Sequence, residues 1–513
     1  MTHSDPVTFP LRLQKLADTI SASGRAYRGK AALIFAFAFL LYFCTRSPVL
    51  DEWDSVQFAL GVREFNLWKH QPHPPGYPLY IFLGWCLTTL GHWDPEFSLH
   101  LLSCLGGALF VTVWFLIARL HFGERFAWLL AGTLAIAPAV WMTSTQVLTD
   151  MLGAAVLSTQ LFCALLYRRS GRLRDLLGAA AVGAIATGVR PQLFAVAVVI
   201  LAGALLQRRP PARVWLIGFG ALIGGCLCWL LPTFYLQAKV TPDLPSWQAY
   251  PAQLYSQWRW RLDKPHAYIG ASDFSVRYFG LRFGAHFLGW FGVGFGFLRL
   301  GALTLVPGAL LVLTGVSVYC ARFPASDREF WNTHRSWALL HIVIIYCVLP
   351  ANQRYYLIIY PLVLTAMGRG FLQLPKRWRP AGFLIPAFLF FNSLPLAIQN
   401  HREEPPPMKF VRFLQARYVP AERKQVVLFV REDQRHVLWY APEFTAFYSP
   451  KVPFATADPK LLANAKAIYT DDAALVLPPD WRLVPVAQFH RSMLIELKQR
   501  DVALYQVERT RAL

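Results

Sequence analysis

Residues 30–54 read KAALIFAFAFLLYFCTRSPVLDEWD, an apolar run that ends in a cluster of three carboxylates. The run over 31–48 is long enough to enter a membrane as a helix. Asp51, Glu52 and Asp54 would be costly to place in hydrocarbon, so they must face water or a polar cavity. The stretch therefore predicts a first membrane helix with a group of acids at its mouth.

The composition is that of a membrane protein, because 55% of the 513 residues are hydrophobic and only 15% are charged. The formal net charge of +21 could indicate a nucleic-acid partner. Most Arg and Lys residues, however, lie in short loops between apolar runs, where they orient helices, so we expect no nucleic acid among the partners. The eight cysteines fall in or beside apolar segments, which argues against a disulfide-stapled domain and against a zinc site.

The apolar segments predict an α-helical polytopic membrane protein with about eleven transmembrane helices. Residues 77–91 are apolar but short, and they predict an interfacial helix along the outer surface. The Gly- and Phe-rich segment 285–300 is either a re-entrant or interfacial piece or a further span. The candidate spans are 31–48, 98–118, 126–143, 151–167, 176–189, 192–207, 214–232, 303–321, 336–350, 356–374 and 381–398.

The distribution of basic loops predicts the orientation in the membrane. Residues 1–30 form a cytoplasmic lead, and the short basic loops share its side, as the positive-inside rule requires. These loops are 118–125, 167–175, 207–213, 321–335 and 375–380. An odd number of spans then places the C-terminus outside. The transmembrane catalytic domain covers 31–400, and its external loops are 49–97 and 233–284.

A separate domain is predicted after the linker that begins at residue 401. Short β-like runs alternate with helix-like pieces, which is typical of a small α/β domain. The domain spans 401–513 and lies on the external face. Its β-like runs are 425–430, 436–442, 466–470, 481–486 and 502–508.

The acids at the first helix mouth have two interpretations. Asp51 could cap a helix, with Asp54 favourable to the helix dipole. A cap, however, needs only one carboxylate. A carboxylate that removes a hydroxyl proton can use a second acid, which raises the pKa of the base or binds a metal together with it. Asp150 begins the fourth span on the same face and has the same two interpretations. Glu52 and Asp150 are the candidate ligands if a divalent metal is present.

Three basic side chains on the outer side are candidate phosphate ligands. Arg190 and Arg354 interrupt apolar sequence where the positive-inside rule disfavours them, and an arginine can hold phosphate with two hydrogen bonds. The alternative for each is an arginine that snorkels at a helix end. His73 lies in the Pro-rich loop HQPHPPGYP, and could contact phosphate or simply hydrogen-bond within the loop. The basic segment 258–266 is a weaker candidate of the same kind.

Five segments in order resemble the glycosyltransferase C superfamily, in particular bacterial relatives of protein O-mannosyltransferases and of the lipid A aminoarabinose transferase. They are LDEWDSVQFALG (50–61), HPPGYPLYIFLG (73–84), TDMLGAAVLS (149–158), GVRPQ (188–192) and QRYYLIIYPL (353–362). The resemblance covers about residues 30–400, and it implies a bacterial inner-membrane protein with a periplasmic C-terminus.

The resemblance also implies a reaction. The family transfers a sugar from a polyprenyl-phosphate donor to an acceptor hydroxyl with inversion. Asp51 matches the general base, Asp150 the acid that opens a later helix, and Arg354 the arginine that faces the lipid phosphate. Ser55 stands where many members have Tyr, so Asp54 is a rival for the role of base. The sequence names neither the sugar nor the acceptor, which could be a protein, a glycan or a lipid.

The alternative function is a polytopic transporter or flippase of lipid-linked sugars. Such a protein predicts a central charged path and two-fold repeats. The sequence shows no repeat, and its acids cluster at one end of the helices. We therefore expect a glycosyltransferase that works among membrane lipids.

Overall fold

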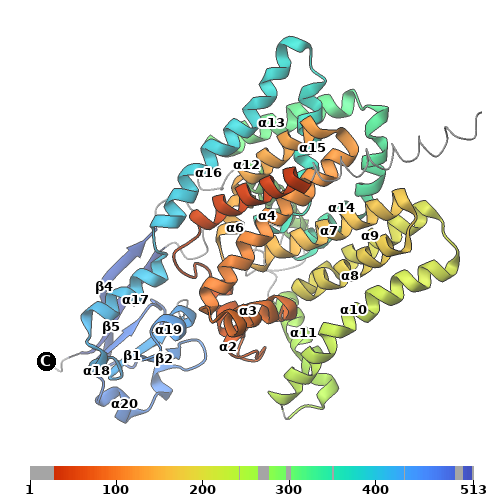
Figure 1. Cartoon of the computed structure of the whole chain (residues 1–513). Helices are drawn as coiled ribbons and strands as arrows, with labels where there is room; N and C mark the ends of the chain where they lie inside the picture. Colours follow the sequence, from red (N-terminus) through yellow and green to blue (C-terminus); the bar gives the residue numbers. More distant parts are fainter. Residues whose placement is uncertain are drawn as a thin grey trace, which may run out of the picture.

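The computed structural model describes residues 28–241, 243–263, 276–295, 302–348, 352–431, 434–491 and 501–510. Figure 1 shows a bundle of long helices with a smaller sheet-containing domain at one end. Most of the lead 1–30, part of 285–300, and Lys264 and His266 of the basic segment 258–266 lie outside the described residues.

Every predicted span contains helix in its described part. Residues 28–44 form the first helix, and two shorter helices, α2 (Trp53–Arg63) and α3 (Pro78–Gly91), follow it. Apolar side chains from the long helices fill one continuous core. The later elements are α4 (Pro95–Phe122), α5 (Glu124–Ala135), α6 (Pro138–Thr145), α7 (Thr149–Ser170), α8 (Leu173–Val189), η1 (Pro191–Leu193), α9 (Phe194–Arg208), α10 (Ala212–Lys239), α11 (Ser246–Asp263), α12 (Val276–Phe295), α13 (Ala302–Ala321), η4 (Ala325–Asp327), α14 (Arg328–Val348), η5 (Gln353–Tyr356), α15 (Tyr360–Leu372), η6 (Lys376–Phe383) and α16 (Leu384–Arg402).

The number of spans is smaller than predicted. Among the described residues five helices are long and apolar enough to cross a membrane, or seven if each of two bent pairs is one span. α8 has 17 residues and α15 has 13, both below the roughly 20 that a straight span needs. α5 and α6 form one bent pair, with an angle of 55° between them at Pro138, since proline cannot continue a helix. The chain is thus a multi-pass membrane protein, and its described part contains fewer candidate spans than the eleven predicted.

The predicted basic loops lie together at one end of the bundle. Arg169 donates to the carbonyl of Leu120 at 2.7 Å, and Arg322 donates to the carbonyl of Gln373 at 2.8 Å. Lys30, near the start of the described chain, pairs with Glu124 in the same region. We call this end of the molecule the basic end.

The C-terminal domain contains a five-stranded sheet in the order β2-β1-β3-β5-β4. β1 (Val426–Val430) is parallel to β2 (Thr445–Tyr448) and to β3 (Ala467–Thr470). β5 (Asp501–Arg509) is antiparallel to both β3 and β4 (Trp481–His490). The helices are α17 (Pro406–Arg417), α18 (Pro420–Arg423), α19 (Gln434–Tyr440) and α20 (Pro459–Ala463).

The strand prediction for 436–442 is wrong, and β2 was not predicted. HVLWYA belongs mostly to α19, which buries His436, Val437 and Trp439. A short apolar run has the same appearance in a buried helix and in a strand. The other four predicted strands are present as β1, β3, β4 and β5.

The C-terminal domain packs against the mouth of the first helix, beside α2 (Figure 1). The amide of Leu50 donates to the hydroxyl of Tyr440 at 2.8 Å, and the ring of His436 lies 3.2 Å from the carbonyl of Leu50. The guanidinium of Arg63 lies 3.6 Å from the ring centroid of Trp439. The domain and the acid cluster therefore share the end opposite the basic end.

Candidate active site

The acids at the first helix mouth are not simple helix caps. Glu52 stands at the N-cap of α2 and makes no capping hydrogen bond with its side chain. Asp54 lies in the first turn of α2, and Asp51 precedes the helix. Asp150 likewise lies in the first turn of α7, whose N-cap is Leu148. The capping interpretations of Asp51 and Asp150 are therefore wrong.

Arg354 joins the carboxylates of two distant segments. Its Nη1 donates to Glu52 at 2.7 Å and its Nη2 to Asp54 at 2.6 Å, while Nε lies 3.8 Å from Asp150. The side chain of Arg354 is 12% exposed. Burial lowers the pKa of Arg354, but the three carboxylates raise it more, so the pKa lies well above its ordinary value. Arg354 is thus a permanent cation held by acids on two sides.

Arg190 provides a second cation beside Asp150. It follows the C-terminus of α8 and pairs with the carboxylate of Asp150. Gly153 on α7 allows this approach, since a Cβ there would lie 2.6 Å from Cδ of Arg190. The guanidinium also faces the ring of Tyr355, 5.2 Å from its centroid. Three carboxylates and two guanidiniums thus form one cluster, which we call the charge cluster (Glu52, Asp54, Asp150, Arg190 and Arg354).

The charge cluster opens into a pocket with about 580 Å³ of empty space, open solvent included. Polar side chains line one part of the pocket and aliphatic side chains line the rest. Such a pocket suits a ligand with a charged group attached to a hydrocarbon chain. Its lining residues are Asp150, Arg190, Gln192, Leu193, His341, Ile344, Ile345, Arg354, Tyr355, Leu357 and Ile358.

Asp51, which the resemblance implies as the base, has its partners outside the charge cluster. It pairs with Arg491, which follows β4, and neither side chain has any exposed surface. Gln146 donates to its second oxygen at 2.9 Å. Arg491 in turn donates to Asn400 at 3.2 Å. Sequence reasoning missed Arg491, because a single arginine after a strand carries no pattern that points to a partner in another domain.

His73 hydrogen-bonds within its loop and approaches Asp54. Its Nδ1 lies 2.6 Å from Gln57 Oε1, and its Nε2 lies 2.9 Å from the Tyr77 hydroxyl. Nδ1 is also 3.7 Å from Asp54. Burial lowers the pKa of His73 to about 4, although Asp54 opposes this shift. A neutral His73 whose two ring nitrogens have protein partners is better suited to holding its own loop against α2 than to binding phosphate.

We expect His73 to make the protein less stable in acid. The unfolded chain takes up the proton near pH 6.5 and the folded chain only near pH 4, so stability falls as the pH drops between these values. The shift corresponds to about 3 kcal/mol. Melting curves of the detergent-purified protein from pH 7.5 to 4 should show a shallower acid loss in His73→Gln. His490 is exposed, so His490→Gln is the control and should melt as the wild type does at each pH. Equal dependence of the melting temperature on pH in His73→Gln and the wild type would contradict a buried, neutral His73 ring.

The structure gives no support to a metal site at Glu52 and Asp150. Both carboxylates face the guanidinium of Arg354. Among the described residues, no group of three or more His, Cys, Asp or Glu side chains is arranged to hold a metal ion. In this structure the negative charge of Glu52 and Asp150 is balanced by Arg354 and Arg190.

Known proteins resemble the chain in both sequence and fold. Residues 72–235 match the family described as dolichyl-phosphate-mannose-protein mannosyltransferase. The crystal structure of ArnT from Cupriavidus metallidurans in the apo state has a TM-score of 0.57 at 15% identity, over 94% of this chain and 98% of that one. The structure of the same protein bound to undecaprenyl phosphate has a TM-score of 0.56 at 15% identity, over 93% and 98% of the two chains.

No curated protein matches the sequence significantly. The family match includes HPPGYP, Asp150 and Arg190, and the shared fold extends over almost the whole chain. One segment of the chain thus matches a mannosyltransferase family, and the chain as a whole shares the fold of ArnT.

Proposed function

We propose that the protein is an inverting glycosyltransferase that moves a sugar from a polyprenyl-phosphate donor to an acceptor hydroxyl. The observation that carries this proposal is the position of Arg354. Its guanidinium lines the pocket and also binds the carboxylates of Glu52 and Asp54. One residue thus connects a site for an anionic lipid with a site for a base.

The pocket is suited to the donor lipid. The phosphate would bind Arg354 and Arg190, and the first prenyl units would lie along Leu193, Ile344 and Ile358. A guanidinium can offer two parallel hydrogen bonds to phosphate oxygens. The match to a structure of ArnT bound to undecaprenyl phosphate supports a prenyl phosphate as the ligand class.

We assign the role of general base to Asp54. The acceptor hydroxyl gives its proton to the Asp54 carboxylate while its oxygen attacks the anomeric carbon of the sugar. The bond from that carbon to the phosphate oxygen breaks, and the polyprenyl phosphate leaves. Arg354 and Arg190 stabilise the charge that develops on the leaving phosphate. Attack opposite the leaving group inverts the anomeric centre.

We place the reaction on the external face of a bacterial inner membrane. The charge cluster and the basic end lie at opposite ends of the bundle, and basic loops are typically cytoplasmic. The C-terminal domain would then be periplasmic and close to the acceptor. The acceptor is a hydroxyl of a protein, a glycan or a lipid.

The donor site can be tested with undecaprenyl phosphate as the probe. Arg354→Ala should weaken its binding about 10- to 100-fold, because one charged contact contributes about 1.5–3 kcal/mol. Arg354→Lys should recover part of this loss, since it keeps the charge but not the fork. Binding can be measured by microscale thermophoresis in detergent, with melting curves to verify folding.

Arg213→Ala is the matched control, because Arg213 is exposed in the first turn of α10, at the basic end. It should bind the probe as the wild type does. If both Arg354 variants bound undecaprenyl phosphate with wild-type affinity, Arg354 would only anchor a helix end. The main support for the proposed function would then be lost.

A further inference from the structure

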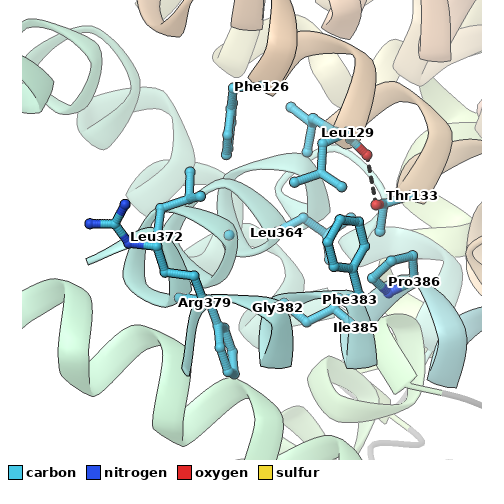
Figure 2. A pocket seen from close by; sticks show the side chains of 13 residues that line it. Phe126, Leu129, Thr133, Leu364, Leu372, Arg379, Gly382, Phe383, Ile385 and Pro386 are labelled. Atoms are coloured by element: carbon cyan, nitrogen blue, oxygen red, sulfur yellow. Dashed lines mark hydrogen bonds between the residues drawn. The ribbon is translucent and has the colours of Figure 1, made fainter. Parts of the chain in front are cut away.

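A second pocket lies among α5, α15, η6 and α16, and Figure 2 shows the side chains that line it. It has about 550 Å³ of empty space, open solvent included. The hydroxyl of Thr133 donates to the carbonyl of Leu129 at 2.7 Å, so this polar group needs no ligand. Arg379 is the charged residue of the lining. The other lining residues are Phe126, Leu130, Leu364, Gly368, Phe371, Leu372, Gly382, Phe383, Ile385 and Pro386.

Arg379 lines this pocket, and further cations without acidic neighbours stand close to it in the sequence. Residues 330–402 contain no Asp or Glu. Arg369 is neutralised by Asp327, to which it donates two hydrogen bonds of 2.8 and 2.7 Å. Lys376, Arg377 and Arg379 remain on η6, and all three are exposed. The pocket mouth therefore carries a local positive charge.

The surroundings of η6 are those of a membrane interface. Trp378 is 57% exposed between Arg377 and Arg379, and Phe383 is 68% exposed. Trp and basic residues are enriched where a membrane protein meets the lipid headgroups. The contact of Arg322 with Gln373 places this segment at the basic end, away from the charge cluster. Basic pockets between membrane helices on the cytoplasmic side are suited to anionic lipids.

We propose that this pocket binds an acyl chain of an anionic glycerophospholipid whose phosphate contacts Arg379 and Lys376. The apolar lining receives the chain, and the cations on η6 select the headgroup by charge. The inference is independent of the proposed function, because the two pockets share no lining residue.

The proposal can be tested by native mass spectrometry of the full chain. The purified protein is titrated with phosphatidylglycerol and, separately, with phosphatidylcholine of the same acyl chains. We expect one phosphatidylglycerol to bind at least fivefold more tightly than phosphatidylcholine. Arg379→Gln should weaken phosphatidylglycerol binding roughly fivefold relative to the wild type. The double variant Lys376→Gln/Arg379→Gln should weaken it roughly fivefold again relative to Arg379→Gln. Both residues are exposed, so the variants should fold.

Two further variants separate the headgroup contact from the acyl-chain contact. Arg213→Gln removes a cation of the basic end outside the pocket and should bind phosphatidylglycerol as the wild type does. Thr133→Leu fills the pocket without changing charge and should weaken both lipids. The proposal would be overturned if phosphatidylglycerol and phosphatidylcholine bound equally well, or if Arg213→Gln weakened phosphatidylglycerol binding as much as Arg379→Gln does. It would also be overturned if Thr133→Leu left the binding of both lipids unchanged, or if undecaprenyl phosphate displaced phosphatidylglycerol one for one.

Discussion

An Arg491→Met variant should be less stable than the wild type by about 3–5 kcal/mol, because it leaves the Asp51 carboxylate buried without its cation. Neither side chain of this pair is exposed, so water cannot replace the lost partner. Gln146 would remain as a hydrogen-bond donor to Asp51, but it carries no charge. Melting curves in detergent should show a loss of several degrees, and proteolysis should reach the linker after α16 sooner.

Arg482→Met is the matched control for Arg491→Met. Arg482 lies on β4, and its pair with Glu508 has a separation of 3.7 Å with 61% and 38% of the two side chains exposed. An exposed pair contributes at most about 1 kcal/mol. The double variant Asp51→Asn/Arg491→Met should recover most of the stability, because it removes both charges. Melting of Arg491→Met at the temperature of Arg482→Met would contradict a structural role for the Asp51–Arg491 pair.

The helices and most of the charge cluster could be predicted from sequence for a simple reason. Apolar runs specify helices that lie in lipid, whatever their partners are. Arg190, Arg354 and Asp150 are unusual where they stand, because charged residues at the ends of apolar segments need a reason. The structure brings these three together with Glu52 and Asp54.

The rest of the site depends on tertiary contacts that leave no local pattern. The sequence offers two acids three residues apart, Asp51 as the match to the family's base and Asp54 as its rival. What separates them is Arg491, which belongs to another domain and covers only Asp51. In the same way, HVLWYA is a helix because it packs His436, Val437 and Trp439 into neighbouring segments, and no periodicity over so few residues reveals this.

The choice of base leads to the second large effect. A base must contact the hydroxyl whose proton it takes, and therefore needs an accessible carboxylate. The side chain of Asp54 is 22% exposed and binds Arg354 at the pocket, whereas the side chain of Asp51 has no exposed surface. Glu52 is 19% exposed and shares Arg354, so we expect it to act mainly through its charge.

Asp54→Asn should therefore lower sugar transfer by roughly 10²-fold or more, because an amide cannot take the hydroxyl proton. Binding of undecaprenyl phosphate and the melting temperature should change little, since Asn keeps the shape of Asp. Asp51→Asn should show the reverse: a lower melting temperature, with transfer largely kept at temperatures well below it. The transfer activity of Glu52→Gln should lie between those of Asp54→Asn and Asp51→Asn.

The measurement is mass spectrometry of cell-envelope glycans from a deletion strain complemented with each variant, beside melting curves of the purified proteins. A stably folded but inactive Asp51→Asn together with an active Asp54→Asn would assign the base to Asp51, and it would mean that the C-terminal domain must release Arg491 before the acceptor can bind.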